Sequence, residues 1–386
     1  MIIGEFCDSY PPHIDGVGMV VRSYARELSK TQECYYIAPR NSSRRFPDSA
    51  DSFPVLKFNS IPIPREAYRL GLPGMDISFH QDLKEIGFDI VHAHTPFSAG
   101  LEALHQARLR GIPLVGTFHS KYYDDFYKKT RSGVISKTAV NLIVSFYEKC
   151  DEVWAVNKAT ADVLWDYGFR GEIVIMPNGT DLWYPTPEDA LHAEEQYGLG
   201  KGSVFLFVGQ QNFKKNTRSI LEAAALYKRK SADFRLVFAG QGPDAEKMRE
   251  LAQELGIGPE TVFTGHIADR KTLMSLYARA DLLVFPSLYD NAPMVVREAA
   301  AAGTPSLLIR DTCAAEGVTD GVNGFLCENT PEAICETMLR ALPNAGAVGQ
   351  KARETIPVPW SEIMHRVVPR YRDLIEQKKE RNRGEL

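Results

Sequence analysis

The stretch Leu282–Gly303, LLVFPSLYDNAPMVVREAAAAG, predicts a buried strand, a short loop and a helix in direct succession. The apolar run Leu282–Phe285 has the length of a buried strand, and Pro286 ends it. Pro293 suits the first helical position because its φ is already fixed near the helical value. Gly303 lies where a helix is expected to end. The pattern indicates one strand–loop–helix unit of an α/β fold.

Two carboxylates lie in this unit, Asp290 in the loop and Glu298 just over one turn into the helix, with seven residues between them. In an open parallel sheet, ligands bind beyond the carboxyl ends of the strands, which is where this loop must lie. Four alanines follow Glu298, so we expect the helix to pack closely against its neighbours. A purely structural alternative stays open, in which Asp290 caps the helix and Glu298 faces solvent.

The length and composition of the chain indicate a two-domain globular protein. With 386 residues, the chain is too long for one ordinary core. Hydrophobic residues make up 44% and charged residues 24%, which is typical of soluble globular proteins. The formal net charge of −4 provides no basic field to collect phosphates, and this argues against nucleic acid as the main partner.

The cysteine and apolar patterns predict a cytoplasmic location. The 6 cysteines are scattered, without a Cys-x-x-Cys pair or a histidine spacing that suits zinc, and we expect core residues in a reducing compartment. No apolar run approaches the roughly 18–20 residues of a membrane-spanning helix. The N-terminal residues lack a basic segment and predict a first strand rather than a signal peptide.

The first strand is expected over Ile2–Cys7, and a loop dense in turn residues, Asp8–Gly18, follows it. Apolar residues then recur at helical spacing. A strand, a glycine loop and a helix can together present backbone N–H groups to a phosphate. The glycines do not form Gly-x-Gly-x-x-Gly, which disfavours a nicotinamide or flavin site, and a structural turn is an equally good interpretation.

Three histidines could be taken for metal ligands. His92 and His94 alternate on one predicted strand and share a face, but no carboxylate is spaced to complete the set. We therefore interpret them as neutral, hydrogen-bonded side chains. His119 ends a predicted strand, so we expect it to point toward the ligand edge of the sheet.

The segment Lys121–Arg131 combines aromatic and basic side chains at helical spacing. One interpretation is a solvated, partly helical surface segment. The other is a patch for a membrane surface or an anionic acceptor, to which the proline-rich loop with Arg65 and Arg69 could contribute. Each basic residue would add only about 1 kcal/mol near an anionic leaflet.

The second half of the chain begins after a segment rich in proline and glycine, Leu182–Gly202, which we interpret as a linker. A buried strand, Ser203–Gly209, and a helix, Thr217–Lys228, then start a second α/β domain. Near the end, Trp360–Lys379 predicts an amphipathic helix, which Pro369 should kink or split.

Five segments, in the same order, resemble the motifs of the GT4-type retaining glycosyltransferases. They are the Pro-Pro-x-x-Asp-Gly-Val loop with Asp15 and Gly16, Gly-Thr-Phe-His-Ser with His119, Pro-Asn-Gly-x-Asp ending at Asp181, the segment Gly209–Asn216, and the pair Asp290 and Glu298. The resemblance covers nearly the whole chain. It implies the GT-B fold, in which two Rossmann-like, doubly wound α/β domains face one another across a cleft. The implied parts are an acceptor-side domain over 1–182, a nucleotide-sugar domain over 183–358, and a helix over 359–386 that crosses back to the first domain.

The resemblance also implies an activity, the transfer of a hexose from a nucleotide diphosphate to a lipid or saccharide acceptor with retention at the anomeric carbon. The implied catalytic residues are His119 and Asp290, which position the sugar, and Lys215, which stabilises the leaving diphosphate. Glu298 would hold the ribose. The implied donor-binding residues are Gly16, Gly209, Gln210, Lys215, His266, Ile267, Asp290, Met294, Val295 and Glu298. The acceptor-side residues are Asp15, Arg65, Arg69, Tyr122, Tyr123 and Lys128.

No cofactor and no metal is implied, because the nucleotide sugar is a substrate and the chain contains no Asp-x-Asp. UDP is the favoured nucleotide and GDP the alternative, from their frequency in the family. The implied partners are the sugar donor and the lipid or saccharide acceptor, without nucleic acid. Peripheral contact with the inner face of the membrane stays open.

Two departures from the family pattern bear on catalysis. Gln210 stands where the family carries an arginine, so one positive charge for the diphosphate is missing. The segment from Asp290 to Pro293, Asp-Asn-Ala-Pro, replaces Glu-Gly-Phe-Gly, which shortens the carboxylate and removes one backbone donor. Two alternatives therefore remain: a sugar-nucleotide binding protein with altered or lost transfer, and other sugar-nucleotide chemistry such as that of a phosphorylase or an epimerase.

Overall fold

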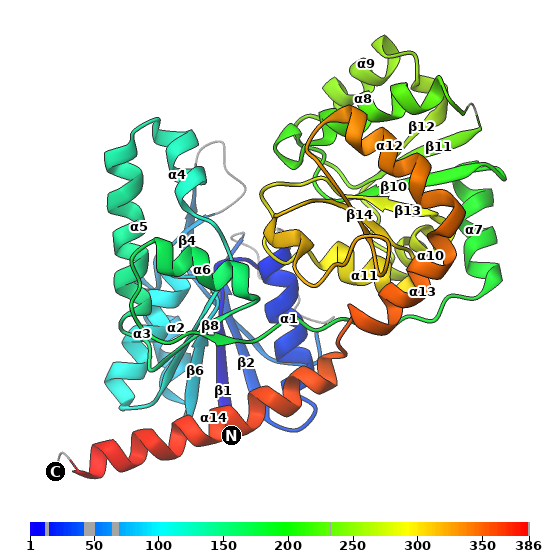
Figure 1. Ribbon diagram of the computed structural model, residues 1–386. Coiled ribbons are helices and arrows are strands. Elements are labelled where there is room, and N and C mark those ends of the chain that lie inside the picture. The colour runs from blue at the N-terminus through cyan, green and yellow to red at the C-terminus, as the bar shows by residue number, and fades with distance from the viewer. Residues whose placement is uncertain (12–14, 42–50, 64–68, 232, 385–386) are drawn as a thin grey trace. The chain divides into compact units, whose positions relative to one another are not determined.

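The computed structural model describes residues 1–11, 15–41, 51–63, 69–231 and 233–384 (Figure 1). The chain divides into two compact units. The first unit comprises Met1–Gly179 together with Trp360–Leu386, and the second comprises Thr180–Pro359. The sequence predicts these boundaries at 182/183 and 358/359.

Within the described residues, the first unit is built on a parallel sheet of 7 strands in the order β3-β2-β1-β6-β7-β8-β9. The strands are β1 (Ile2–Phe6), β2 (Glu33–Pro39), β3 (Val55–Phe58), β6 (Ile90–Ala93), β7 (Leu114–Phe118), β8 (Glu152–Ala155) and β9 (Val174–Ile175). The strand order reverses between β1 and β6, so the carboxyl ends of these two strands mark the position where a ligand is expected.

Helices cover the strands of this unit, which explains why the strands are continuous apolar runs. The helices are α1 (Gly16–Leu28), α2 (Ile77–Lys84), α3 (Ser98–Arg110), α4 (Tyr123–Thr130), α5 (Gly133–Tyr147), α6 (Lys158–Asp166) and α14 (Trp360–Gly384). A 3-10 turn, η1 (Pro73–Met75), and a small antiparallel pair, β4 (Ser60–Pro62) and β5 (Arg69–Gly71), complete the unit. Phe6, Phe58 and Phe118 lie fully buried in its core.

The second unit repeats this plan with a parallel sheet of 6 strands, counted over the described part of the chain, in the order β12-β11-β10-β13-β14-β15. The strands are β10 (Ser203–Val208), β11 (Phe234–Ala239), β12 (Thr261–Gly265), β13 (Leu282–Val284), β14 (Ser306–Ile309) and β15 (Phe325–Cys327). The order reverses between β10 and β13, so a second ligand position is expected at their carboxyl ends. The two parallel sheets confirm the predicted α/β class.

The helices of the second unit are α7 (Pro187–Tyr197), α8 (Thr217–Lys228), α9 (Ala245–Glu254), α10 (Arg270–Arg279), α11 (Met294–Ala302), α12 (Pro331–Ala341) and α13 (Ala345–Thr355). Short 3-10 turns lie at η2 (Phe213–Lys215), η3 (Gly258–Glu260), η4 (Cys313–Ala315) and η5 (Leu342–Asn344). No helix in the described ranges of either unit is long and apolar enough to cross a membrane.

The opening stretch of the sequence analysis forms the predicted strand, loop and helix. Strand β13 ends at Val284, and α11 begins at Met294. Pro293 lies one position earlier than predicted, as the N-cap residue of α11. Gly303 follows the helix with a φ of 84°, a left-handed conformation that glycine adopts without strain.

The predicted linker is wrong over part of its length, because residues 187–197 form helix α7. The Thr186 side chain accepts a hydrogen bond from the backbone N–H of Asp189, and the Asp189 carboxylate accepts one from the N–H of Thr186. Pro187 occupies the first turn, and Gly198 ends the helix with a φ of 63°. The proline and the glycine are therefore helix boundaries here rather than signs of an irregular segment.

Replacing the capping residue of α7 is expected to weaken the second unit. Thr186→Ala removes a hydrogen-bond acceptor from the helix N-terminus and should cost about 1 kcal/mol of unfolding free energy. The urea midpoint of unfolding measures the change. Thr186→Ser keeps the hydroxyl and serves as the control, and equal midpoints for the Ala and Ser variants would contradict the capping role.

Helix α14 returns the chain to the first unit after the second unit is complete. It is one continuous helix, so the prediction that Pro369 splits it is wrong. The helix buries an apolar stripe that includes Ile363, Val367 and Tyr371, each 0% exposed. Packing of this stripe outweighs the one backbone hydrogen bond that a proline removes.

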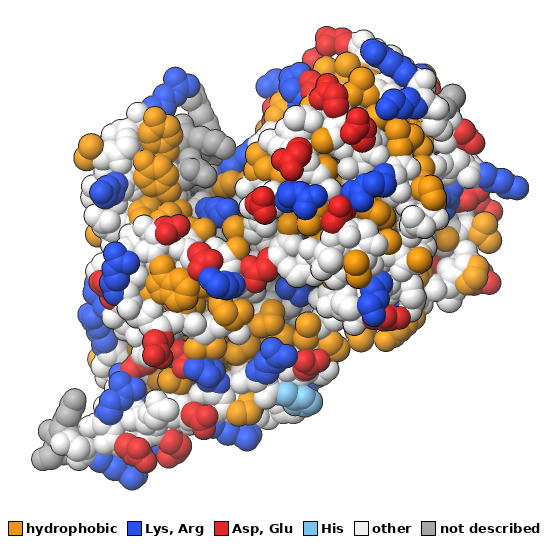
Figure 2. Space-filling view, in the orientation of Figure 1, with side chains coloured by type: hydrophobic (Ala, Val, Ile, Leu, Met, Phe, Trp, Pro, Cys, Tyr) orange, Lys and Arg blue, Asp and Glu red, His pale blue; other side chains and the backbone are white. Residues whose placement is uncertain are grey.

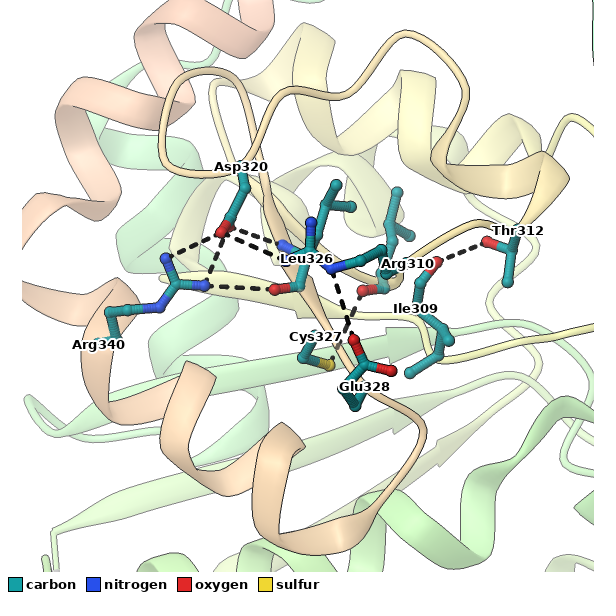
Figure 3. Close-up of polar contacts among 9 residues, drawn as sticks. Ile309, Arg310, Thr312, Asp320, Leu326, Cys327, Glu328 and Arg340 are labelled. Atoms are coloured by element: carbon teal, nitrogen blue, oxygen red, sulfur yellow. Dashed lines mark hydrogen bonds and ion pairs between the residues drawn. The ribbon is translucent and has the colours of Figure 1, made fainter.

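An ion-pair network ties the loop before β15 to the neighbouring strand and helix (Figure 3). The Asp320 carboxylate accepts hydrogen bonds from the Arg340 guanidinium and from the backbone N–H of Leu326, both at 2.9 Å. Arg310, which follows β14, lies 3.8 Å from Asp320 and 3.6 Å from Glu328. These contacts hold the last two strands together at the carboxyl edge of the sheet.

Candidate functional site

The carboxyl edge of the second sheet brings two predicted catalytic residues into direct contact. Lys215, in the 3-10 turn η2, donates a hydrogen bond from Nζ to Oδ1 of Asp290 at 2.5 Å. Their side chains are only 19% and 20% exposed. A lysine and an aspartate from segments 75 residues apart thus form one charged pair where the strand order reverses.

The turn that carries Lys215 is fixed by two asparagines. Asn212 caps the turn by accepting a hydrogen bond from the backbone N–H of Lys214 at 2.8 Å. Asn216 has a φ of 61° and donates from Nδ2 to the backbone carbonyl of Pro286, in the loop after β13. The turn is therefore bonded to the loop that leads to Asp290, and this fixes the backbone of Lys215 beside that loop.

The second carboxylate oxygen of Asp290, Oδ2, is buried and has no hydrogen-bond partner among the described residues. A buried acceptor without a donor is costly, by about 1–3 kcal/mol. A hydroxyl group of a bound ligand would supply the missing donor. The atom therefore marks a polar contact point inside the candidate site.

A second cation lies beside this pair. The Lys214 ammonium is 3.4 Å from the centroid of the Tyr289 ring, and Tyr289 directly precedes Asp290. Gln210, which follows β10, is exposed and uncharged. The positive charge at this part of the edge is therefore carried by Lys214 and Lys215.

Glu298 is held in place by two side chains of α10. Arg270 donates to its Oε1 at 2.7 Å, and the Tyr277 hydroxyl donates to its Oε2 at 2.9 Å. Glu298 is 7% exposed, so the structural alternative in which it faces solvent is wrong. Each carboxylate oxygen has more than one acceptor site, so the carboxylate can still accept hydrogen bonds from a ligand.

The remaining residues predicted to bind the donor also follow strands of this edge, except Gly16, which lies in the first unit. Gly209 follows β10 with a φ of 147°, which a side chain would strain. His266 and Ile267 follow β12, and Met294 and Val295 form the first turn of α11. The structure thus places the predicted set of the second unit on one edge of one sheet.

In the first unit, Asp15 and Gly16 lie at the N-terminus of α1. The Asp15 side chain caps the helix by accepting a hydrogen bond from the backbone N–H of Gly18 at 2.8 Å. Gly16 is exposed, and a Cβ at this position would meet no atom within 4 Å. Backbone N–H groups at the start of α1 can therefore face a ligand, as the loop pattern predicts.

The predicted hydrogen-bonded state of His92 and His94 is found, but the statement that no carboxylate completes their set is wrong. Glu5 of β1 lies opposite His92 in the strand register, and its Oε2 is 2.7 Å from Nε2 of His94. One ligand atom from each of the three lies within 4.8 Å of the others, close enough for a metal ion. His92 Nδ1 already has a partner in Tyr371 and His94 Nε2 one in Glu5, so hydrogen bonding accounts for the cluster. The absence of a metal stays a prediction.

His119 directly follows β7 at the carboxyl edge of the first sheet, as predicted. Its Nε2 lies 3.1 Å from Nδ1 of His94, and the side chain is 9% exposed. Burial lowers the pKa of His119 well below its ordinary value, although the nearby Asp15 acts in the opposite direction. His119 is therefore neutral at pH 7 and can take part in hydrogen bonds through one donor and one acceptor nitrogen.

The predicted acceptor-side residues separate into buried and exposed groups. Tyr122 is buried against Phe118 and is 9% exposed. Tyr123 is 36% exposed, and its ring stacks on that of Tyr127. Arg69 donates to Ser60 across the β4–β5 pair. Arg65 and the side chain of Lys128 lie outside the described residues.

Sequence reasoning did not identify Glu5, Arg270 or Tyr277 as parts of these sites. Arg270 and Tyr277 precede Glu298 by 28 and 21 residues, and only the fold brings α10 and α11 together. Glu5 lies 89 residues before His94, within the predicted first strand Ile2–Cys7, where most residues are apolar. A charged residue inside such a strand is the one signal that could have drawn attention to it.

Comparisons with known proteins show what the chain is similar to along most of its length. The family model "Glycosyl transferases group 1" matches residues 192–356, and the model "Glycosyltransferase Family 4" matches residues 14–184. The α-monoglucosyldiacylglycerol synthase of Streptococcus pneumoniae is 28% identical over 317 residues, which cover 79% of this chain and 70% of that protein. The GDP-mannose-dependent α-mannosyltransferase of Corynebacterium glutamicum is 24% identical over 335 residues, which cover 85% and 77%.

Solved structures confirm the predicted GT-B class. Anabaena HepE in complex with UDP has a TM-score of 0.80 at 18% identity, and the match covers 97% of this chain and 100% of that one. Sucrose-phosphate synthase from Thermosynechococcus elongatus also has a TM-score of 0.80, at 20% identity, with 97% and 99% covered. With both units matched by models of one enzyme family, the chain belongs to the group 1, family 4 glycosyltransferases.

Proposed function

We propose that this enzyme transfers a hexose from a UDP-sugar to a membrane lipid, with retention at the anomeric carbon and without a metal ion. The observation that carries the proposal is the arrangement at the carboxyl edge of the second sheet. A buried carboxylate, Glu298, is anchored there by two donors, and a lysine, Lys215, is paired with Asp290. Glu298 suits ribose hydroxyls, Lys215 suits a diphosphate, and Asp290 suits a hydroxyl of the sugar.

Each of these side chains has a distinct task in binding the donor. Glu298 would accept hydrogen bonds from the ribose hydroxyls, while Arg270 and Tyr277 keep its carboxylate oriented. The ammonium of Lys215 would leave its ion pair with Asp290 and bind the diphosphate, where negative charge develops as the sugar leaves. Asp290 would then accept a hydrogen bond from the sugar through Oδ2, which lacks a partner among the described residues.

The names of similar proteins support the choice of nucleotide. HepE is similar to this chain in fold and was solved with UDP-glucose. The relative from Streptococcus pneumoniae is named for a glucosyl lipid product. The relative from Corynebacterium glutamicum is named for GDP-mannose, so a GDP-sugar is the alternative donor.

Retention is proposed to proceed on the front face of the sugar. Glu298 is bonded to Arg270 and Tyr277 and is assigned to the ribose, and Asp290 is assigned to a hydroxyl of the sugar, so neither carboxylate is proposed as a covalent nucleophile. The departing phosphate would instead accept the proton of the acceptor hydroxyl. Lys215 and backbone N–H groups at the strand ends would stabilise the diphosphate in place of a metal ion.

A lipid acceptor is favoured by the outer face of α5. Val134, Ile135 and Leu142 are 78%, 55% and 70% exposed along this helix, and Lys137 is exposed among them. Figure 2 shows hydrophobic side chains with lysine and arginine beside them over α4 and α5. A helix with an apolar face and basic residues suits the surface of an anionic membrane.

The donor proposal is tested by the melting temperature with UDP, GDP, ADP and TDP, each alone. A nucleotide at ten times its dissociation constant should stabilise the protein by about 1.4 kcal/mol. We expect a rise with UDP in the wild type and no rise in Glu298→Ala. Glu316→Ala, on the same unit but in the turn after β14, is the control and should respond like the wild type.

A transfer assay then separates the alternatives. We expect label from UDP-glucose to enter the organic phase when vesicles contain diacylglycerol, with or without EDTA, and the product linkage to be α by NMR. Label on added oligosaccharides alone would replace the lipid with a saccharide acceptor. Nucleotide binding without any transfer would favour a binding protein, and loss of transfer in EDTA would contradict metal independence.

A further inference from the structure

A buried chain of hydrogen bonds connects His119 with helix α14 through the interior of the first unit. His119 Nε2 lies 3.1 Å from His94 Nδ1, and His94 Nε2 lies 2.7 Å from Glu5 Oε2. The Tyr371 hydroxyl donates to Glu5 Oε1 at 3.2 Å and lies 2.6 Å from His92 Nδ1. Glu5, His92, His94 and Tyr371 are each 0% exposed.

The strand register explains how these groups meet. Glu5 is opposite His92 in the parallel pair of β1 and β6, and His94 follows two residues later on the same side. Strand β7 lies on the other side of β6, and its carboxyl end brings His119 beside His94. The sheet therefore places a carboxyl group and two imidazole rings in a row that leads to the ligand edge.

In a neutral imidazole one ring nitrogen is a donor and the other an acceptor. A ring that accepts a hydrogen bond at one nitrogen therefore donates from the other. Burial lowers the pKa of His94 to about 3 and that of His119 well below its ordinary value, so both rings are neutral at pH 7. The direction of the Glu5–His94 hydrogen bond consequently determines the direction of the His94–His119 bond.

We propose that Glu5, acting through His94, sets which ring nitrogen of His119 carries the proton, and that at neutral pH this nitrogen is Nδ1. Glu5 and His94 are positioning residues in this scheme. A carboxylic acid at Glu5 donates to His94 Nε2. His94 Nδ1–H then donates to His119 Nε2, which leaves the His119 proton on Nδ1.

Two observations favour a protonated Glu5 that donates to His94. Burial raises the pKa of Glu5 to about 8, although the hydrogen bond from Tyr371 acts in the opposite direction. The proton belongs on the oxygen that faces His94, because that contact is the shorter one and an imidazole nitrogen is a better acceptor than a phenol oxygen.

No charged group offsets the burial of Glu5 within the part of the chain that is described. The titratable groups that face it are Tyr24 of α1, Cys34 of β2, His92 and His94 of β6, and Tyr371 of α14. Burial raises the pKa of the tyrosines and the cysteine and lowers that of the histidines, so all are neutral at pH 7.

The consequence for function rests on the proposed transfer reaction. With the proton on Nδ1, His119 presents this nitrogen as a donor, which suits the oxygen of a sugar hydroxyl or a phosphate. If Glu5 lost its proton, it would accept a hydrogen bond from His94 Nε2–H. The hydrogen bond between His94 and His119 would then reverse its direction as well. His119 Nδ1 would then be an acceptor, and a ligand oxygen without a proton to donate would be repelled.

Imidazole nitrogen chemical shifts test the proposal directly. Protein labelled with ¹⁵N histidine, without nucleotide, is studied by long-range ¹H–¹⁵N correlation from pH 6.5 to pH 9.5. His119→Gln identifies the His119 signals. We expect the Nδ1–H form at pH 6.5 in the wild type, and a change to the Nε2–H form with a midpoint near 8.

Two variants make the test specific. Glu5→Gln keeps an N–H that can donate to His94 and cannot ionise, so we expect the Nδ1–H form at every pH. Tyr371→Phe leaves the Glu5–His94 contact in place and should keep the Nδ1–H form at pH 6.5, with a higher midpoint. An Nε2–H form in the wild type at pH 6.5, or the same pH response in Glu5→Gln, would overturn the proposal.

The measurement does not depend on the donor or acceptor. If UDP does not bind, the proposed function is contradicted, but the result for the tautomer of His119 is unaffected. If UDP binds and the tautomer of His119 does not respond to Glu5, only the proposal that Glu5 sets this tautomer is contradicted. In the transfer assay we expect kcat/KM of the wild type to fall above pH 8, and Glu5→Gln should abolish this fall.

Discussion

Lys215→Ala is expected to lower kcat by about 100- to 1,000-fold, the usual loss when one preorganised group that stabilises developing charge is removed. Lys215 is buried to about four-fifths and bonded to the loop of Asp290, so its ammonium cannot be replaced by a water-exposed cation at the same place. Gln210 is uncharged, so it cannot stabilise the negative charge of the diphosphate in place of Lys215. Single-turnover transfer from UDP-glucose measures the effect on the chemical step.

Two controls show whether charge at this position is the cause. Lys215→Arg keeps a cation and should recover part of the rate, although its planar group fits a different geometry. Lys230→Ala removes an exposed lysine just after α8 and should leave the rate unchanged. A loss of less than tenfold in Lys215→Ala would mean that another group, with Lys214 the first candidate, stabilises the leaving diphosphate.

Glu5→Gln is expected to become more stable than the wild type as the pH rises. The Glu5 carboxyl has an ordinary pKa of 4.5, and burial raises it to about 8 in the folded protein. Between these values the folded state keeps a proton that the unfolded state has lost, so the stability of the wild type falls with increasing pH. This loss of stability is absent below the ordinary pKa of 4.5 and is complete above the folded-state pKa of about 8.

The expected difference is large because the two pKa values are far apart. From pH 5 to pH 8.5, Glu5→Gln should gain roughly 3 to 4 kcal/mol relative to the wild type. The buried histidines titrate in both proteins, so their contribution cancels in the difference. Urea unfolding at several pH values measures it, and two parallel curves of unfolding free energy against pH would show that Glu5 is not protonated in the folded state.

Much of the fold could be predicted because its signals are local. The helix Thr217–Lys228 has the predicted bounds, and β13 ends one residue before the end of the predicted apolar run. Helix α7 was missed, since Pro187 and Gly198 were interpreted as marks of a linker. Together with the threonine and aspartate of the capping box, the same two residues are the start and stop of a helix.

The candidate sites were predicted only where one motif carries the residues. Glu298 and Lys215 lie in segments that resemble family motifs, and both lie at the predicted sheet edge. Their partners depend on tertiary structure, as with Arg270 beside Glu298. The contact between Glu5 and His94 follows from the pairing of strands that lie far apart in the sequence, and no spacing rule encodes it.

The return of α14 to the first unit has a consequence for the order in which a nascent chain can fold. Trp360, which packs against Gly179, and Tyr371 leave the ribosome only after the whole of the second unit. Until then, Glu5 of β1 and His92 of β6 lack their contact with Tyr371 of α14. The second unit can therefore finish folding while the first is still incomplete, and this prolongs the time in which the first unit can aggregate.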